Sequence, residues 1–330
     1  MDIMYASRSI ESMATMPMIQ LQCKGPNGSG PDWVPLKQDW KSRWCTLPAC
    51  YIEDLAGRID AFETRESDVF VVTFMKSGTT WMQELAWLLL NDLDFERAKS
   101  SYPFHRSPFL EYSAINPVVA IDSVAMCNQI QDNSRLIKSH LPAQLLPREI
   151  WKHGRKIIYV ARNPKDVVVS SYHQMKGMHY SEGSLDDFVE YFIADKIMYT
   201  SFWAHVIDFY KMRNEENVFF VTYEDMSRDL QDVVKRLSRF LNCKDLSNSE
   251  MEKLLNHLSF KNIKESKFGN PTGFIKTLRK TTDDFEFMRR GIVGSYKDEL
   301  SLEHKDKIDK WTMSVLEEHG LTESDIFGEF

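Results

Sequence analysis

A short segment places a lysine, three hydroxyl side chains and a glycine between two apolar patterns of different period. Val69–Thr73 is β-branched and aromatic, as expected of a strand buried on both faces, and from Thr79 apolar residues recur at helical spacing. The first amides of a helix lack partners within the helix and lie at the positive end of its dipole, so they bind phosphate or sulfate readily. The segment Lys76–Thr80 therefore predicts an anion site, in which Lys76 supplies charge and Gly78 lets the backbone approach the anion.

The order of residues in this segment differs from that of the usual ATP-binding loop. That loop has four residues between its first glycine and a Gly-Lys pair, whereas Lys76 precedes Gly78 by two positions. An ATP-binding loop of the ordinary type is therefore disfavoured. Taken alone, the segment is also compatible with a plain strand–helix turn that carries a surface lysine.

Three other predicted strands end close to residues that bind anions or move protons. The strands are Arg135–Lys138, Lys156–Ala161 and Asn217–Tyr223, and the residues at or just past their ends are His140, Arg162 and Tyr223. Ligands of parallel sheets bind at the carboxyl ends of the strands. These residues and Lys76 are therefore expected to share one site.

Helical patterns separate the predicted strands, which indicates an α/β fold with a central, mainly parallel sheet and helices on both faces. These patterns lie at residues 54–62, from 79 onward, and at 167–174, 185–195, 199–213, 225–241, 249–257 and 302–319. Two stretches without sustained periodicity, 92–117 and 260–290, are expected to be long loops, the second of them mobile. Both are expected to form walls of a ligand pocket.

Length and composition are those of a soluble globular protein. Of 330 residues, 43% are hydrophobic and 27% are charged, and no apolar stretch is long enough to cross a bilayer. Residues 1–50 are expected to form a loosely organised arm or linker, and residues 51–330 a single domain. The start lacks the pattern of a secretory signal and the five cysteines are scattered, which indicates a cytoplasmic protein with reduced thiols and no zinc site. The net charge of −7 counts against nucleic acid as a partner.

Segments in four places, in one order along the chain, resemble motifs of the cytosolic sulfotransferases. FMKSGTTW, residues 74–81, is similar to the family's 5′-phosphosulfate loop YPKSGTTW, and KSHLP, residues 138–142, is similar to KTHLP. YVARNPKDVVVSSYH, residues 159–173, resembles the 3′-phosphate segment, and FMRRGIVGSYK, residues 287–297, resembles the closing RKGxxGxxK motif. The resemblance covers roughly residues 52–306 and is nearest to insect members. It implies a P-loop-kinase-like sulfotransferase fold, the co-substrate 3′-phosphoadenosine 5′-phosphosulfate (PAPS), no metal, and no membrane partner.

The resemblance also implies a reaction and the residues that carry it. A sulfuryl group would pass from PAPS to the hydroxyl or amine of a small apolar acceptor, such as a phenol, a sterol or another alcohol. His140 would be the general base, a role that suits imidazole because its unperturbed pKa is near neutral. Lys76 would offset charge on the leaving phosphate, and Lys138 would stabilise the oxygens of the transferring group. Arg162 and Ser170 would hold the 3′-phosphate.

Further residues are assigned to the two ligands by the same resemblance. Those that would bind the co-substrate are Lys76, Ser77, Gly78, Thr79, Thr80, Trp81, Arg162, Ser170, Tyr223, Phe260, Arg289, Arg290 and Gly291. Among them, Trp81 and Phe260 would flank the adenine and Tyr223 would bond a ring nitrogen. Those that would surround the acceptor are Phe74, Phe104, Phe109, Tyr112, Lys138, His140 and Tyr172, together with the loop 260–290. Each aromatic residue could equally be ordinary core, so only about half are expected to touch the acceptor.

Some positions depart from the family pattern. Met75 stands in place of a proline, Leu258 in place of a threonine that commonly contacts adenine, and Tyr296 in place of a tryptophan. The dimer signature KxxxTVxxxE is matched only in part, by Lys297, Ser301, Leu302 and Asp306. The protein is therefore expected to be a monomer or a weak homodimer.

The sequence leaves other functions open. A nucleoside or nucleotide kinase would use a similar sheet, but it needs a Gly-Lys-Ser/Thr loop, which is absent, and a Mg²⁺-binding aspartate. A catalytically silent anion-binding or carrier protein would keep the site without turnover. A dehydratase would sulfonate an allylic alcohol and then eliminate the sulfate, as some insect relatives do.

Overall fold

Parallel strands form the central sheet, in the order β5-β4-β6-β7. Their bounds are β4 (Val69–Thr73), β5 (Leu136–Ser139), β6 (Lys156–Ala161) and β7 (Val218–Thr222). The computed structural model describes residues 5–25, 28, 30–116 and 121–328. Val71 of β4 lies beside Lys138 of β5 and Ile158 of β6, so the carboxyl ends of these strands meet at one edge. The predicted parallel sheet is confirmed, with strands close to their expected bounds.

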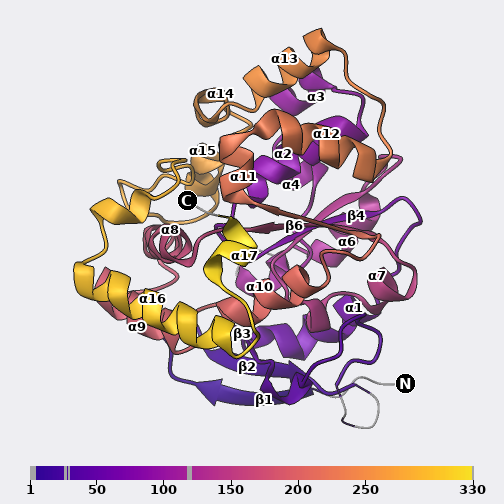
Figure 1. Ribbon diagram of the computed structural model, residues 1–330. Helices are drawn as coiled ribbons and strands as arrows, with labels where there is room; N and C mark the ends of the chain where they lie inside the picture. Colours follow the sequence, from indigo (N-terminus) through magenta and orange to yellow (C-terminus); the bar gives the residue numbers. More distant parts are fainter. Residues whose placement is uncertain (1–4, 26–27, 29, 117–120, 329–330) are drawn as a thin grey trace.

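Helices cover both faces of this sheet because the side chains of β4 alternate between two apolar cores. Val69 and Val71 belong to one core, and Phe70 and Val72 belong to the other. The first core includes α2 (Thr79–Leu90) and α12 (Leu230–Leu241), and the second includes α8 (Pro164–Gly177), α9 (Leu185–Ile193), α10 (Phe202–Lys211) and α16 (Leu302–Glu317). Figure 1 shows the sheet between these two layers, as expected.

Shorter helices fill the connections. They are α1 (Ala56–Asp60), α3 (Phe95–Ser100), α4 (Pro103–Arg106), α5 (Tyr112–Ile115), α6 (Ser123–Gln129), α7 (Arg148–Lys152), α11 (Tyr223–Arg228), α13 (Asn248–His257), α14 (Phe260–Glu265), α15 (Thr272–Leu278) and α17 (Glu323–Phe327). The helical pattern expected over 225–241 is divided into α11 and α12. Asp229 leaves the helical conformation (φ −147°, ψ 79°) and caps α12 by accepting from the amide of Asp232.

The two stretches expected to be loops contain helices, which corrects that expectation. Helices α3, α4 and α5 lie in 92–116, whereas residue 117 is outside the described residues, and α14 and α15 lie in 260–290. These helices are too short to show a periodic apolar face, and their caps define them instead. Asp94 accepts from the amide of Arg97, Pro103 begins α4, and Ser259 accepts from the amide of Asn262.

The first fifty residues hold a three-stranded antiparallel sheet, where a loosely organised segment was expected. Its strands are β1 (Tyr5–Ile10), β2 (Met18–Cys23) and β3 (Cys45–Pro48), at the bottom of Figure 1. Gln20 and Gln22 interrupt the apolar pattern of β2, so the sequence did not indicate a buried strand. Both side chains are nevertheless buried, and they donate to the carbonyls of Asp195 and Trp40. The backbone of Thr46 exchanges hydrogen bonds with Tyr199 and Thr200, which joins this sheet to the main body.

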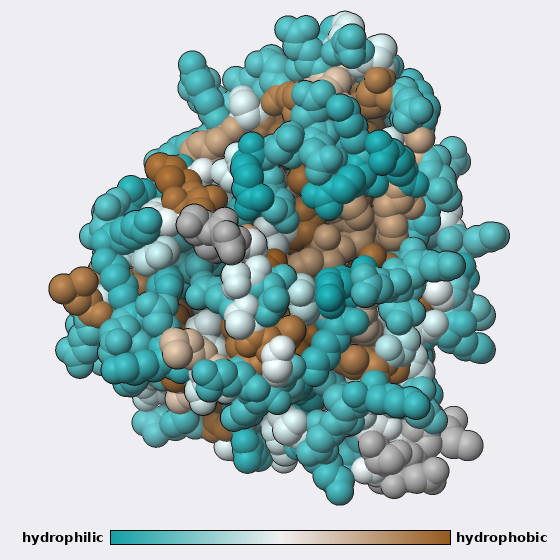
Figure 2. Space-filling view, viewed as in Figure 1, coloured by the Kyte–Doolittle hydropathy of each residue, from teal (hydrophilic) through white to brown (hydrophobic). Residues whose placement is uncertain are grey.

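The outer surface of the face drawn in Figure 2 is mostly hydrophilic, with apolar side chains in separate patches. Within the described part of the chain, no helix combines the length and apolarity needed to cross a membrane. The apolar side chains instead fill the two cores on either side of the sheet.

A buried ion pair joins the beginnings of β4 and β5. Arg135 makes a bidentate contact with the carboxylate of Asp68. Its Nε and Nη2 atoms lie 2.8 Å and 2.5 Å from the two carboxylate oxygens. The two side chains are at most 2% exposed, and Arg135 also donates to the carbonyl of Glu63 and to Asn128. Since the adjacent amide of Val69 bonds to the carbonyl of Arg135, this pair sets where the two strands begin to pair.

Asp68→Asn is expected to lower the free energy of unfolding by about 3–5 kcal/mol, because it leaves a buried guanidinium without its counter-ion. The matched control is Asp54→Asn, which removes an exposed carboxylate 3.6 Å from Arg58 and is expected to change that free energy by less than about 0.5 kcal/mol. Chemical denaturation of both variants measures the difference. Equal effects in the two variants would contradict the structural role of the buried pair.

Candidate functional site

The loop between β4 and α2 holds an unusual backbone conformation. Lys76 has φ 65° and Gly78 has φ 100°, both in the left-handed region. A Cβ atom at Gly78 would lie 2.7 Å from the ring of Tyr223, so glycine is required there for space as well as for conformation. Gly78 is the N-cap of α2 without a side-chain cap, and the buried hydroxyl of Ser77 has no partner among the described residues. Hydrogen-bond donors at the start of α2 are therefore available to a ligand.

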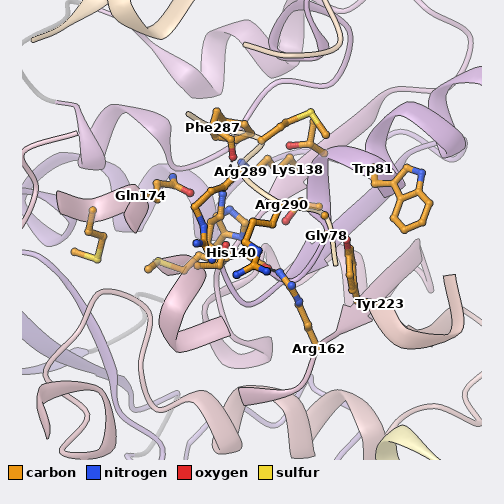
Figure 3. Close-up of a pocket in the computed structure, with 18 of the residues that line it drawn as sticks. Gly78, Trp81, Lys138, His140, Arg162, Gln174, Tyr223, Phe287, Arg289 and Arg290 are labelled. Carbon is orange, nitrogen blue, oxygen red and sulfur yellow. Dashed lines mark hydrogen bonds between the residues drawn. The ribbon is translucent and has the colours of Figure 1, made fainter. Parts of the chain in front are cut away.

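A cavity of about 310 Å³ opens at this end of the sheet. The predicted site residues that line it are Lys76, Gly78, Thr79, Thr80, Trp81, Phe109, Lys138, His140, Arg162, Ser170, Tyr223, Phe260, Arg289, Arg290 and Gly291. Figure 3 shows cationic side chains from separate parts of the chain around the same space. The structure thus brings together residues from all four motifs.

His140 has one ring nitrogen directed at the main chain. Nδ1 lies 2.8 Å from the carbonyl oxygen of Thr73, which can only accept, so Nδ1 carries the proton. In the neutral ring, Nε2 then has the free lone pair. Burial and the neighbouring Lys138 lower the pKa of His140 well below its usual value, so the ring is neutral at pH 7. The arrangement can accept a proton from a ligand in the cavity.

Two residues that the sequence interpretation missed hold the backbone of His140. A carboxylate oxygen of Glu111 accepts from the amide of His140 at 2.5 Å, and Nε2 of His205 donates to the carbonyl of His140 at 3.1 Å. Glu111 is fully buried, and burial raises its pKa to about 7. No local motif marks either residue, because both reach His140 only through the tertiary fold.

Positive charge is concentrated in the cavity. Burial, followed by the nearby Arg162, Lys138 and Arg289, lowers the pKa of Lys76 to about 7. Burial lowers the pKa of Lys138 to about 8, although Glu111 acts in the opposite direction. An anion in the cavity would reverse both shifts, because it favours the protonated lysines. The cluster is therefore built for a ligand with negative charge.

Arg162 links the β4–α2 loop to the closing segment near residue 290. Its guanidinium donates to the carbonyls of Lys76 at 3.1 Å and Ile292 at 3.3 Å, and lies 4.3 Å from the centre of the Tyr223 ring. Nε of Arg162 is buried without a partner among the described residues. Ser170 lines the same cavity two turns further along α8. This part of the cavity has donors left for an anion.

The two arginines of the closing segment, Arg289 and Arg290, form ion pairs with acidic side chains. Arg289 pairs with Glu299, which also contacts His173, and Arg290 lies 2.5 Å from Asp298 and 3.7 Å from Glu299. An anion that binds these arginines must compete with the two carboxylates. Arg289 and Arg290 are thus placed at the cavity but are not free in this structure.

Aromatic residues line the same cavity as the cationic side chains. The indole of Trp81 donates to the carbonyl of Leu258 at 2.9 Å, and its ring lies 5.6 Å from that of Tyr223 in an edge-on contact. Phe260 packs on Gly291 so closely that a Cβ atom there would lie 2.1 Å from the phenyl ring. Trp81, Tyr223 and Phe260 all line the cavity, so aromatic surface is available there to a base.

Some predicted site residues do not line the cavity: Phe74, Ser77, Phe104, Tyr112 and Tyr172. Phe74 is fully buried, with ring centres 5.1 Å from Phe202 and 5.8 Å from Phe192. It therefore belongs to the core, which corrects the sequence interpretation.

The other aromatic residues of this group also lie outside the cavity. Phe104 contacts Tyr112, which in turn packs against Phe109. Tyr172 accepts from Lys176 and meets the ring of Phe188. Only Phe109 of these aromatic residues reaches the cavity, so Phe104 and Tyr112 support the wall from behind, whereas Tyr172 packs elsewhere on α8.

The remaining wall is made of residues that no motif marked. They include Ile115, Gln174, Met175, Tyr180, Met198 and Tyr199. Most are apolar, so this half of the cavity complements the cationic half. Among the described residues, no group of three or more histidine, cysteine, aspartate or glutamate side chains is arranged so that it could hold a metal ion.

Comparison with known families identifies this arrangement. A family model described as the sulfotransferase domain matches residues 66–320, which is more than half of the chain. The chain belongs to the sulfotransferase family. The resemblance inferred from the four motifs, and with it the P-loop-kinase-like sulfotransferase fold, is confirmed.

Relatives of this sulfotransferase come from vertebrates and insects. Sulfotransferase 1 family member D1 of Rattus norvegicus is 36% identical over 270 residues, which is 80% of this chain and 88% of the relative. The luciferin sulfotransferase of Photinus pyralis is 36% identical over 272 residues, covering 77% of this chain and 73% of the relative. Among solved structures, a retinol dehydratase in a complex with retinol and PAP superposes with a TM-score of 0.80 at 26% identity, covering 94% of this chain and 96% of the other.

Lys76→Met is expected to stabilise the ligand-free sulfotransferase by about 1 kcal/mol at pH 6.5, because it removes one charge from a crowded cluster. The pKa of Lys76 is about 7 in the folded protein, against 10.5 for an ordinary lysine in the unfolded chain. Between these two pH values the unfolded chain therefore binds more protons than the folded protein. The loss of folding stability caused by the charge on Lys76 is therefore complete below pH 7 and disappears as the pH approaches 10.

Denaturation of Lys76→Met and of the unchanged protein over this pH range measures the difference. The matched control is Lys310→Met, at an exposed position that pairs with Asp306, where a change below about 0.5 kcal/mol is expected. A stability gain in Lys76→Met that persists at pH 10 would show that the crowding of charge is not its cause.

Proposed function

We propose that this sulfotransferase transfers the sulfuryl group of PAPS to a hydroxyl of a small apolar acceptor, with His140 as the general base. The observation that carries the proposal is the His140 ring, whose Nδ1 donates to the carbonyl of Thr73 and whose Nε2 is left to accept a proton. This ring lines a cavity with one cationic half and one apolar half. Family membership and the similarity to a dehydratase complex with PAP support PAPS as the donor.

The cationic half suits a donor that carries phosphate at both ends of its ribose. The start of α2 with Lys76 receives the 5′-phosphosulfate end, since its first amides have no side-chain cap and the Ser77 hydroxyl has no partner among the described residues. Arg162, Ser170 and the two arginines of the closing segment receive the 3′-phosphate. Trp81 and Phe260 hold the adenine between them, with Tyr223 near its edge. These assignments rest on the donors and rings that line one continuous cavity.

In the proposed reaction, the acceptor oxygen forms a bond to sulfur while the bond between sulfur and the 5′-phosphate oxygen breaks. Nε2 of His140 takes the acceptor proton and later releases it to solvent. Lys76 offsets the charge that develops on the leaving phosphate, and Lys138 stabilises the sulfuryl oxygens. The products are a sulfate ester and adenosine 3′,5′-bisphosphate.

The charges of the donor also prepare the base. In the empty cavity, burial and Lys138 keep the pKa of His140 low, which makes a weak base that is always unprotonated at pH 7. A donor with several negative charges raises that pKa, because it stabilises the protonated imidazole. His140 therefore becomes a stronger base when the donor is present.

Elimination is a second outcome that the same site supports. The retinol dehydratase fold matches almost the whole chain, and sulfate leaves readily from an allylic sulfate ester while a proton is lost from the neighbouring carbon. An acceptor with an allylic hydroxyl would then yield an alkene instead of a stable sulfate ester. The kinase interpretation is set aside, because the chain belongs to the sulfotransferase family.

We expect the protein to act in the cytoplasm as a monomer or a weak homodimer, with residues 51–330 as the catalytic domain. The cytosolic family supports the location, and the partial dimer signature at residues 297–306 supports the weak association. In that signature Leu302 is 84% exposed, so its side chain adds no packing to the single chain.

Two measurements test the proposed function. Calorimetry is expected to detect tight binding of adenosine 3′,5′-bisphosphate and weak or no binding of ATP–Mg²⁺. A panel of phenols, sterols and allylic alcohols with labelled PAPS is expected to yield labelled sulfate esters, or, for allylic alcohols, dehydrated products with free labelled sulfate. Retention of ATP–Mg²⁺ without binding of the bisphosphate would overturn the proposal.

His140→Asn is expected to lower kcat by about 10²–10⁴-fold, because the amide can still bond to Thr73 but cannot take the proton. Its affinity for adenosine 3′,5′-bisphosphate is expected to stay within about threefold, since the phosphate-binding residues are unchanged. The control is His153→Gln, at the exposed C-cap position of α7, with unchanged kcat. An unchanged kcat in His140→Asn would remove His140 from the role of base.

A further inference from the structure

The apolar half of the cavity contains two side-chain oxygens without partners. Its wall is formed mainly by Met75, Phe109, Ile115, Met175 and Met198. Gln174 and Tyr199 line the same cavity, and their Oε1 and Oη atoms are buried with no hydrogen-bond partner among the described residues. Buried polar atoms are nearly always paired in folded proteins. Two unpaired oxygens on the wall of a ligand cavity therefore indicate a partner on the ligand.

Gln174 lies at a defined distance from the proposed phosphate site. It follows Ser170 by four residues on α8, so both residues project from one face of the helix and both line the cavity. The rise along the helix separates them by about 6 Å. In Figure 3 the amide of Gln174 points from α8 toward the space near His140 and Arg289. Gln174 thus faces the region where an acceptor would lie, beyond the reacting groups.

Tyr199 has a strained backbone conformation. It is 2% exposed and has φ 71°, a left-handed conformation that is rare for a residue with a bulky side chain. Its amide donates to the carbonyl of Thr46 at 2.7 Å, and its ring lies 5.4 Å from that of His140. Backbone strain that is stabilised by the surrounding fold is common at ligand sites. The strain here keeps the phenol next to the proposed base.

We propose that Gln174 and Tyr199 form a second polar subsite, which selects an acceptor with a second hydroxyl remote from the one that is sulfonated. A hydroxyl suits both ends of the amide, because it donates to the oxygen or accepts from the nitrogen of Gln174. It can also accept from the phenol of Tyr199. The preferred acceptor is thus an apolar diol, with one hydroxyl at His140 and the other at Gln174. This inference rests on the proposed function and specifies its acceptor class.

Matched acceptor pairs test the subsite with labelled PAPS as the donor. The pairs are 4-phenylphenol with 4,4′-biphenol, and 1-decanol with 1,10-decanediol. For at least one pair, kcat/KM is expected to favour the diol by about tenfold or more, beyond the roughly twofold advantage of having two equivalent hydroxyls. A preference of twofold or less in every sulfonated pair would overturn the inference.

Variants connect the preference to the two residues. Gln174→Leu is expected to reduce the diol preference by about tenfold, and Tyr199→Phe by about threefold, because each removes one hydrogen-bonding partner. The control is Gln231→Leu, on the exposed face of α12, where the preference stays unchanged. Thermal unfolding verifies that each variant is folded. A diol preference that Gln174→Leu leaves intact would assign the selection to another part of the wall.

The outcomes separate this inference from the proposed function. If the unchanged protein sulfonates 4-phenylphenol or 1-decanol but does not prefer the diols, the transferase proposal stands and the second subsite is rejected. If no acceptor in the panel is labelled and adenosine 3′,5′-bisphosphate does not bind, the proposed function itself fails.

Discussion

The crowding of positive charge at the carboxyl end of the central sheet is the constraint on which the rest of the site depends. Arg162, Lys138 and Arg289 each oppose protonation of Lys76, and with burial they bring its pKa to about 7. Repulsion of this kind acts strongly where little water separates the charges, and a bound anion relieves it. Although the chain has a net charge of −7, its cavity gathers several cations, and this local cluster favours ligands with several negative charges.

Backbone carbonyls hold two of these cations in place. Nζ of Lys76 donates to the carbonyl of Phe287, 211 residues away, and Arg162 donates to the carbonyls of Lys76 and Ile292. Asp166, whose carboxylate lies 3.7 Å from the Arg162 guanidinium, accepts from the amides of residues 294 and 296. The closing segment is thus tied to both the β4–α2 loop and α8. Carbonyl oxygens thus define the positions of Lys76 and Arg162 without removing their charge, whereas Arg289 and Arg290 are paired with acidic side chains.

Local patterns were sufficient to predict the parallel sheet, the long helices and the loop at Lys76, because β-branched runs, helical spacing and clustered glycine and hydroxyl residues are visible within a few positions. The antiparallel sheet of the first fifty residues was missed because Gln20 and Gln22 are buried only through bonds to distant carbonyls. Glu111 was missed because it reaches His140 only through the tertiary fold, and Gln174 because it lies one residue beyond the segment that resembles the 3′-phosphate motif. Phe74 was misplaced for the opposite reason, since its position next to the motif suggested the cavity although its ring enters the core.

Thr73 shows why the site belongs at the end of a buried strand. Its carbonyl accepts from Nδ1 of His140 at 2.8 Å, and its hydroxyl lies 2.7 Å from that of Thr79 at the start of α2. The proposed base and the proposed phosphate loop are therefore held by one residue, which has no exposed surface and lies between two neighbouring strands. Group transfer in line requires the attacking oxygen, the sulfur and the leaving oxygen to be aligned within a fraction of an ångström. Anchoring both sides of the reaction to Thr73 meets that requirement, because any movement of the strand end displaces the base and the loop together and preserves the geometry between them.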